Sequence, residues 1–335
     1  MHTDTFSFGY IPDLPDNRDF KFKAASISTL PESVDLREYL QPVKNQGKLG
    51  ACTAFATTAM VEYVRNKQGF LSWDASPLFT YYSTRKIENT LDIDSGAYVR
   101  DALKSAVNDG VAKETSWPYI VENFTITPPV SVWEEAEKHQ ALTYYRLDQT
   151  KENILGCLAD GYPFTFGARL YQSFINTQCG FLVHNYLPMP VLSAEKFVGG
   201  HCMLAVGYST NNNNTYILAR NSWSTSVGLD GYHNIPLDYF LDSTLSSDFW
   251  TIRSEEKVDE DIPTPTPTVS VSVVSVTPTP AVVPIVTSTE IAVTSTPAPI
   301  PMPTPVVFSD SVWKKPHTYF MLLFVLASLL FFLLK

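Results

Sequence analysis

The chain has 335 residues, of which 44% are hydrophobic, so it can bury the core of one or two domains. Its formal net charge is −10, and residues 262–335 hold only two acidic residues against three lysines, so the negative charge lies on residues 1–261. An acidic folded part without a basic stripe excludes a nucleic-acid-binding protein.

The cysteines and the N-terminus indicate a reducing compartment. Four cysteines are spread through the chain without close pairs, so we do not expect a disulfide framework. The first 30 residues contain early acids and lack the apolar run of a secretory signal peptide. We therefore expect reduced thiols and a folded part that lies in the cytosol.

Composition divides the chain into four zones. Residues 1–30 are polar and rich in turns, which predicts an extended segment on a surface. Residues 31–255 carry the mixed patterning of a folded domain. Residues 256–313 alternate proline, threonine, serine and valine, a composition typical of an extended polyproline linker. Residues 314–335 end in an apolar run that we predict to be a transmembrane segment.

The first half of the folded domain has helical patterns. A helix is predicted to begin at Cys52 and to end near Gly69. Ser76 followed by Pro77 is typical of an N-cap and the first position of a second helix. Residues 97–110 place apolar side chains on one face of a third helix.

The second half of the domain has strand patterns. Short runs rich in aromatic and β-branched residues, bounded by Gly, Asn or Pro, occupy 162–170, 201–208, 215–220 and 248–253. Helices followed by strands predict an α+β domain whose two lobes meet at a cleft.

Cys52 is a candidate nucleophile because of its place at a helix start. The amides of the first turn and the helix dipole favour a thiolate there, which lowers the thiol pKa. The alternative is a small buried apolar residue, and we expect that role for Cys157 and Cys202. Gln46, six residues before Cys52, adds a side-chain amide donor.

These segments resemble the papain-like cysteine peptidases, whose VDxR, QGxxGxC and following AF are matched in this chain. The matching positions are Val34, Asp35, Arg37, Gln46, Gly47, Gly50, Cys52, Ala54 and Phe55. Downstream, His201 in GGHCMLAVGY and Asn221 in RNSWSTSVGLDGY match the family's histidine and asparagine in order and spacing. The resemblance spans residues 9–253.

The chain is most similar to the branch of this family found in bacteria and large DNA viruses. The agreement runs through GYIPDLPDNRDF, SPLFTYYSTRKIE, DSGAYVRDALK and GYHNIPLDYF. Leu49 stands where many secreted members have a disulfide cysteine, which agrees with a reducing compartment. The resemblance implies a papain-like α+β fold, with a helical N-terminal lobe and a β-barrel-like C-terminal lobe on either side of the active site.

The resemblance also implies a thiol protease that cleaves peptide bonds through a thioester acyl-enzyme. Cys52 would be the nucleophile and His201 the acid and base, while Asn221 would orient the imidazole ring. Gln46 and the Cys52 amide would form an oxyanion hole.

Three further residues are assigned supporting roles by the resemblance. Trp223 would shield the bond between the histidine and the asparagine from water. Ser95 and Gly96 would present a backbone edge to an extended polypeptide substrate.

No metal or other cofactor is expected. The remaining histidines lack a cysteine or carboxylate at metal-ligand spacing, so we predict surface or structural roles for them. They are His2, His139, His184, His233 and His317.

Two other functions remain open at this stage. One is a membrane-displayed binding or structural protein that keeps the fold without the activity. The other is a transpeptidase, in which an amine replaces water as the acceptor of the acyl group.

The C-terminal run of residues 319–334 would span about 24 Å as a helix, slightly less than the ~30 Å hydrocarbon core of a bilayer. A core helix or a cleaved lipid-anchor signal are alternatives, but the spacer argues against the first and the missing signal peptide against the second. Lys314 and Lys315 precede the run and Lys335 follows it, which predicts a single-pass anchor with the catalytic domain in the cytosol.

Overall fold

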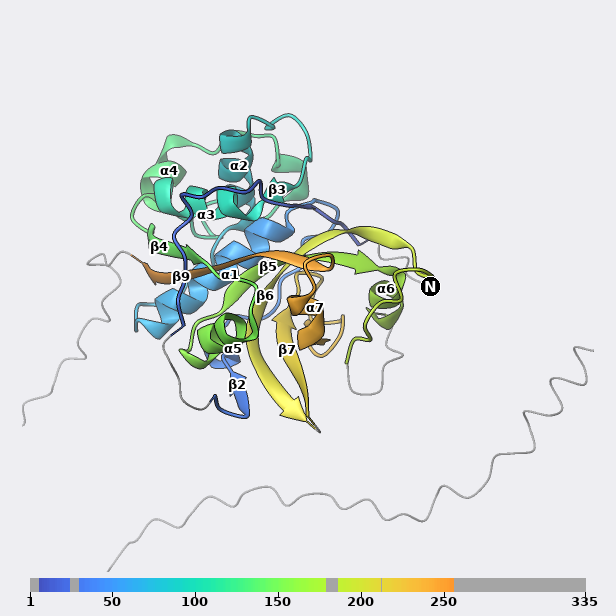
Figure 1. The fold of residues 1–335 in the computed structure, drawn as a ribbon. Coiled ribbons are helices and arrows are strands. Elements are labelled where there is room, and N and C mark those ends of the chain that lie inside the picture. Colours follow the sequence, from blue (N-terminus) through green and yellow to red (C-terminus); the bar gives the residue numbers. More distant parts are fainter. Residues whose placement is uncertain (1–5, 25–29, 179–185, 212, 256–335) are drawn as a thin grey trace, which may run out of the picture. The chain divides into compact units, whose positions relative to one another are not determined.

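A computed structural model describes residues 6–24, 30–178, 186–211 and 213–255 (Figure 1). Its helices are α1 (Cys52–Lys67), α2 (Pro77–Glu88), α3 (Val99–Asn108), α4 (Val130–Ala136), α5 (Lys151–Ala159), α6 (Gln172–Gln178) and α7 (Leu237–Leu241). Its strands are β1 (Tyr10–Ile11), β2 (Ser33–Asp35), β3 (Ala97–Tyr98), β4 (Ala141–Arg146), β5 (Phe164–Tyr171), β6 (Phe197–Asn211), β7 (Asn214–Arg220), β8 (Tyr232–Pro236) and β9 (Ser246–Glu255).

The three predicted helices are confirmed as α1, α2 and α3. The Ser76 side chain accepts a hydrogen bond from the Phe79 amide, and Pro77 occupies the first turn of α2. After α3, Gly110 has a φ of +77° and a Cβ there would lie 1.8 Å from the Ala136 carbonyl oxygen, so glycine is required at this turn.

The four predicted strands are confirmed as β5, β6, β7 and β9, and they form one largely antiparallel sheet. The strand order is β4-β9-β5-β6-β7-β8, with β2 also paired to β6. The described β4 and β8 lie at opposite ends of this path, so the described sheet is open and is not the closed barrel that a β-barrel-like lobe would suggest. The combination of separate helices with an antiparallel sheet is the predicted α+β fold. Sequence patterns did not predict β4 and β8, which are shorter and carry exposed or half-buried positions.

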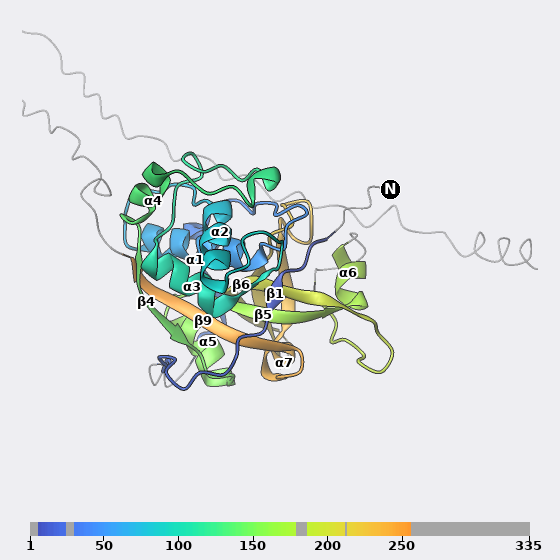
Figure 2. The same cartoon turned by 90° about the horizontal axis from the view of Figure 1, so that it is seen from above.

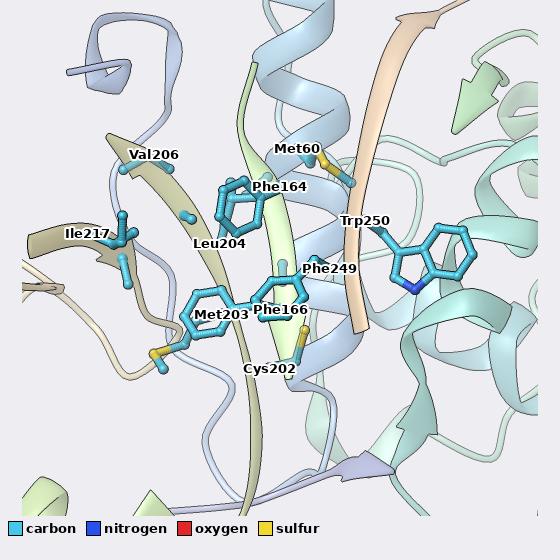
Figure 3. Close-up of a cluster of buried hydrophobic side chains, with 14 of the residues drawn as sticks. Met60, Phe164, Phe166, Cys202, Met203, Leu204, Val206, Ile217, Phe249 and Trp250 are labelled. Carbon is cyan, nitrogen blue, oxygen red and sulfur yellow. The ribbon is translucent and has the colours of Figure 1, made fainter. Parts of the chain in front are cut away.

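Helix α1 lies between the two halves of the domain. In Figure 1, α2, α3 and α4 gather on one side of α1, while β6, β7 and α5 lie on the other. Figure 3 shows the core that joins them, in which Met60 of α1 belongs to one hydrophobic cluster with Phe164 and Leu204 of the sheet. Each such buried side chain contributes roughly 1.5–3 kcal/mol of transfer free energy, so the orientation of α1 against β6 is strongly specified.

Residues 6–13 form a segment that we call the N-terminal strap. It includes β1, which pairs in parallel with β3 and contacts β5 and β6, as Figure 2 shows from above. The sequence predicted an extended segment on a surface, and the segment is extended. It is not confined to the surface, however, because Tyr10 is buried in the hydrophobic core, as is Phe22 further along the predicted segment 1–30.

The linker and tail predicted from residues 256–335 lie outside the described residues. Among the residues that the structure describes, no helix has the length and hydrophobicity needed to cross a membrane.

Candidate active site

Cys52 is the first residue of α1 and has no exposed surface. The backbone amides of Cys202, Gly9 and Thr53 lie near its sulfur and oppose the rise of the thiol pKa that burial causes. The packing of α1 against β6 brings Cys52 close to Cys202, the residue that follows His201 on β6.

His201, Asn221 and Trp223 form a buried cluster at the ends of β6 and β7. The Nε2 atom of His201 lies 2.8 Å from Oδ1 of Asn221. The indole of Trp223 stacks on the imidazole, with ring centroids 4.4 Å apart and planes 25° apart. The structure therefore brings His201 together with Asn221 and Trp223, and Asn221 lies 20 residues further along the chain.

The orientation of the Asn221 amide is fixed by a backbone donor. The amide of Ser222 donates to Asn221 Oδ1 at 2.7 Å, so this atom must be the oxygen. Oδ1 is an acceptor only, and His201 must therefore carry its proton on Nε2. The Nδ1 atom of His201 is buried without a hydrogen-bond partner, so its lone pair is available as a base.

Gln46 is fully buried beside this cluster. Its Oε1 accepts from the Ser222 hydroxyl at 2.5 Å, which directs the amide nitrogen away from Ser222. That nitrogen donates to the carbonyl oxygens of Leu49 at 2.9 Å and Ser7 at 3.2 Å. Gln46 thus already binds one backbone carbonyl of the N-terminal strap.

The strap covers the predicted reacting groups. The Gly9 backbone lies near the Cys52 sulfur, and the Gly9 carbonyl accepts a hydrogen bond from the Ala97 amide at 2.8 Å. Phe6 and Phe8 pack against Trp223, with centroid distances of 4.4 and 5.9 Å. These contacts explain why neither Cys52 nor His201 has exposed surface.

Two glycines allow this close approach. A Cβ on Gly9 would lie 1.8 Å from the Gly50 carbonyl oxygen. Gly96 has a φ of +73°, and a Cβ there would lie 2.3 Å from the Gly9 carbonyl oxygen. The strap therefore seats with its backbone directly on the backbone of the cleft.

The other end of the strap is held by a polar network on β9. The hydroxyl of Tyr10 donates to Asp248 Oδ2 at 2.6 Å, and the Asp13 amide donates to the same oxygen at 2.8 Å. The Trp250 indole donates to Asp13 at 2.9 Å, and Arg146 pairs with Asp248 at 2.7 Å. Because these groups are buried or half-buried, the network fixes the register of the strap.

Burial sets the protonation states in this closed arrangement. It raises the pKa of the Cys52 thiol to about 11 and lowers the pKa of His201 to about 4, although the Asn221 hydrogen bond opposes the latter shift. The sequence predicted a thiolate at the helix start. In the closed cleft burial acts against that prediction, because desolvation favours the neutral thiol and the neutral imidazole.

Ser95 and Gly96 lie beside the strap rather than in open space. The Ser95 hydroxyl donates to Thr90 Oγ1 and to the Gly96 carbonyl, so it stabilises its own turn. The next residue, Ala97, uses its amide to bind Gly9. The edge predicted to hold an extended substrate thus holds an extended segment of the same chain.

Sequence reasoning missed two parts of the site. The strap was not recognised because its glycine contacts depend on the folded shape of the cleft. His233, for which a surface or structural role was predicted, is buried with Nε2 3.3 Å from Asn221 Nδ2. Its place on a strand next to β7 was the available signal, but β8 was not predicted.

Among the described residues, no group of three or more histidine, cysteine or acidic side chains is placed to hold a metal ion. The three described cysteines, Cys52, Cys157 and Cys202, are free and buried. Cys179 lies outside the described residues.

A cysteine at the start of the central helix and a histidine–asparagine pair on the adjoining sheet are features of the papain-like class of cysteine peptidases. The model of the papain family of cysteine proteases matches residues 30–240. An uncharacterized peptidase C1-like protein of Acanthamoeba polyphaga mimivirus is 35% identical over 76% of this chain and 89% of its own length. The chain belongs to the papain family of cysteine peptidases.

Solved structures agree with this assignment. Xylellain, a cysteine protease from Xylella fastidiosa, is 33% identical with a TM-score of 0.69, over 74% of this chain and 96% of xylellain. A digestive procathepsin L 3 of Tenebrio molitor shares the fold at 19% identity, with a TM-score of 0.56 over 70% of this chain and 73% of its own. The papain-like fold and the cysteine-type peptidase class predicted from sequence are confirmed.

The closed cleft predicts slow modification of Cys52. In the unchanged chain, iodoacetamide should label Cys52 slowly between about pH 6 and pH 8, because the thiol is neutral and covered. Gly9→Ala should accelerate this labelling at least ~10-fold, since the added Cβ prevents the strap from seating. Peptide mapping of the labelled chain measures the rate at each cysteine.

Leu14→Ala is the control, because the Leu14 side chain is 71% exposed at the end of the strap. It should label like the unchanged chain. Equal labelling of Cys52 in the unchanged chain and in Gly9→Ala would contradict the closed arrangement.

Proposed function

We propose that this protein is an endopeptidase that uses Cys52, His201, Asn221 and Gln46, and that the N-terminal strap holds it in a latent form. The observation that carries the proposal is the fixed amide of Asn221. It commits His201 Nε2 to a hydrogen bond and leaves Nδ1 without a hydrogen-bond partner. His201 precedes Cys202 on β6, and the Cys202 backbone lies near the Cys52 sulfur.

The proposed reaction is acyl transfer. The Cys52 proton passes to His201 Nδ1 as the sulfur bonds to the substrate carbonyl carbon, whose oxygen becomes an oxyanion. His201 returns this proton to the leaving amine when the C–N bond breaks. Water then attacks the thioester with His201 as base, and the C–S bond breaks to release the acid and restore the thiol.

Gln46 is suited to stabilise the oxyanion. One of its two amide protons is used by the Leu49 carbonyl, and the other binds the Ser7 carbonyl of the strap. Once the strap leaves, this second N–H faces the cleft while Ser222 still fixes the amide orientation. A preorganised donor of this kind favours the transition state because it needs no reorganisation during the reaction.

Substrate can enter only when the strap moves away. Water then reaches the cleft, and the desolvation that favours the neutral thiol and imidazole decreases. The helix N-terminus and the Asn221 oxygen both favour the thiolate–imidazolium pair, so strap release couples access to activation.

The peptidase proposal predicts different losses for two substitutions. In a Gly9→Ala background, Cys52→Ala should abolish hydrolysis of a denatured protein, and Gln46→Ala should lower kcat by roughly 10²–10³ through loss of one oxyanion donor. Initial rates under reducing conditions measure both effects.

Gln41→Ala is the matched control, because the side-chain amide of Gln41 donates to the hydroxyl of the exposed Ser72, outside the proposed site. It should leave kcat unchanged. Undiminished hydrolysis by Cys52→Ala would refute the proposed site. Adding an amine acceptor and analysing the products distinguishes hydrolysis from transpeptidation, and absence of any turnover would support a binding or structural protein.

Latency predicts activation by a substitution far from the thiol. Tyr10→Phe removes the hydroxyl that binds Asp248 while keeping the ring, and weakening the strap by one hydrogen bond should raise kcat/KM roughly three- to tenfold. Tyr39→Phe, at a partly exposed tyrosine on the 3₁₀ turn 37–39, is the control and should have no effect. Activity of Tyr10→Phe equal to that of the unchanged chain would argue against latency.

We further propose that the tail tethers the enzyme to a membrane as a single-pass anchor with the catalytic domain in the cytosol. The apolar residues 319–334 and the preceding lysines support this topology. Residues 262–313, if extended as polyproline, would reach up to about 160 Å, so the domain could act on polypeptides near the bilayer without contacting it.

The tether predicts separable solubility and activity. A chain ending at Asp310 should be soluble with unchanged kcat/KM on a peptide, whereas the full chain should sediment with membranes and resist carbonate extraction. Protease added to intact microsomes should digest the catalytic domain. Release of the full chain by carbonate, or glycosylation of the Asn123 sequon, would contradict this topology.

A further inference from the structure

His233 lies directly behind the proposed active site. It is the second residue of β8, is 2% exposed, and sits opposite Ala219 of β7 in the strand register. Asn221 follows β7 by one residue, so the pairing of the two strands carries the His233 ring to the far side of the Asn221 amide. The Nδ2 atom of Asn221 and the Nε2 atom of His233 are 3.3 Å apart.

The direction of this hydrogen bond follows from the Asn221 orientation. The backbone amide of Ser222 fixes Oδ1, so the atom that faces His233 is the NH₂ group. An NH₂ group only donates, and His233 must therefore accept through an unprotonated Nε2. The neutral ring then carries its proton on Nδ1.

The surroundings of His233 are built for a neutral ring. Gly228 has a φ of +66°, and a Cβ there would lie 2.3 Å from His233 Cε1, so glycine leaves the space that the ring occupies. The ring of Phe174 packs against it at 5.4 Å. His201 is the titratable group that acts on it, and burial, followed by repulsion from His201, lowers the pKa of His233 to about 3.

We propose that His233 is a positioning residue that holds the Asn221 amide in the orientation required by His201. This inference rests on the proposed peptidase mechanism and extends its chain of contacts to His201, Asn221 and His233. His233 touches neither the substrate nor the reacting atoms.

The physical role of His233 is to satisfy and polarise the buried amide. Asn221 is 4% exposed, so an Nδ2 without an acceptor would be left unsatisfied away from water. By accepting a hydrogen bond from Nδ2, His233 also polarises the Asn221 amide, which increases the negative partial charge on the oxygen that faces His201. When His201 gains a positive charge on Nδ1 during the reaction, this oriented oxygen stabilises the imidazolium.

The test compares His233→Leu with His233→Gln in the full chain carrying Gly9→Ala. His233→Leu removes the acceptor and should lower kcat about tenfold with little change in KM. It should also move the alkaline limb of the kcat/KM profile to lower pH, because a weaker hydrogen bond lowers the pKa of His201. His233→Gln can accept through its side-chain oxygen and should restore most of both losses.

Ile235→Val controls for a simple loss of packing on β8. Ile235 is 1% exposed and lies two residues further along the same strand, so the substitution weakens the core without touching Asn221. It should change neither kcat nor the alkaline limb. Equal losses in His233→Leu and His233→Gln, or an unmoved limb in His233→Leu, would overturn the positioning role.

Nitrogen-15 NMR of the histidine-labelled full chain gives a readout that needs no catalysis and no folded variant. His233 should show a protonated Nδ1 and an unprotonated Nε2 throughout the neutral range. A protonated Nε2 would overturn the inference even if the enzyme is active. If the chain shows no peptidase activity while NMR finds the expected tautomer, the proposed function fails but the Asn221–His233 contact stands.

Discussion

The Asn221 amide is the group on which the polar arrangement of the site depends. Its oxygen accepts from the Ser222 backbone and faces His201, and its nitrogen faces His233. Once the Ser222 amide fixes the orientation of the Asn221 side chain, His201 can only donate to it and His233 can only accept from it. A single peptide N–H at the end of β7 therefore determines the tautomers of two buried imidazole rings.

This constraint matters because the cleft is dry when the strap is in place. Desolvation favours the neutral thiol on Cys52 and the neutral imidazole on His201, as the directions of both pKa shifts show. Under the proposed mechanism, the same residues need a charged pair to react. In the closed form the residues of the site are thus already positioned, while burial disfavours the charged forms of Cys52 and His201. Under the proposal, activation requires a change in solvent exposure and not a rearrangement of these residues.

Sequence patterns were sufficient wherever local chemistry decides the structure. The Ser76 cap, the start of α1 at Cys52 and the long apolar strands are local signals, and the spacing of His201 and Asn221 reflects strands that were correctly predicted. The strand β8 was not predicted because it is only five residues long and the polar residues His233 and Asn234 interrupt its apolar pattern. The position of His233 depends on the pairing of β8 with β7, so it could not be deduced without that strand.

The strap shows a different limit of sequence reasoning. The strap packs against the cleft backbone to backbone: Gly9 lies against Gly50, and Gly96 lies against the Gly9 carbonyl. Gly50, in the turn before Cys52, has no Cβ atom, so another chain segment can lie directly on the backbone there.

A surface of this kind recognises an extended backbone through its carbonyl and amide groups rather than through side chains. The strap satisfies the Gln46 donor with one carbonyl and the Ala97 amide with another. A polypeptide substrate offers the same groups in the same extended form, so the features that would bind substrate also bind the strap. The strap also forms hydrogen bonds from Tyr10 and Asp13 to Asp248 of β9, outside the groups that a substrate would share with it. These bonds give the strap an advantage over a free peptide without altering the residues proposed to perform the reaction.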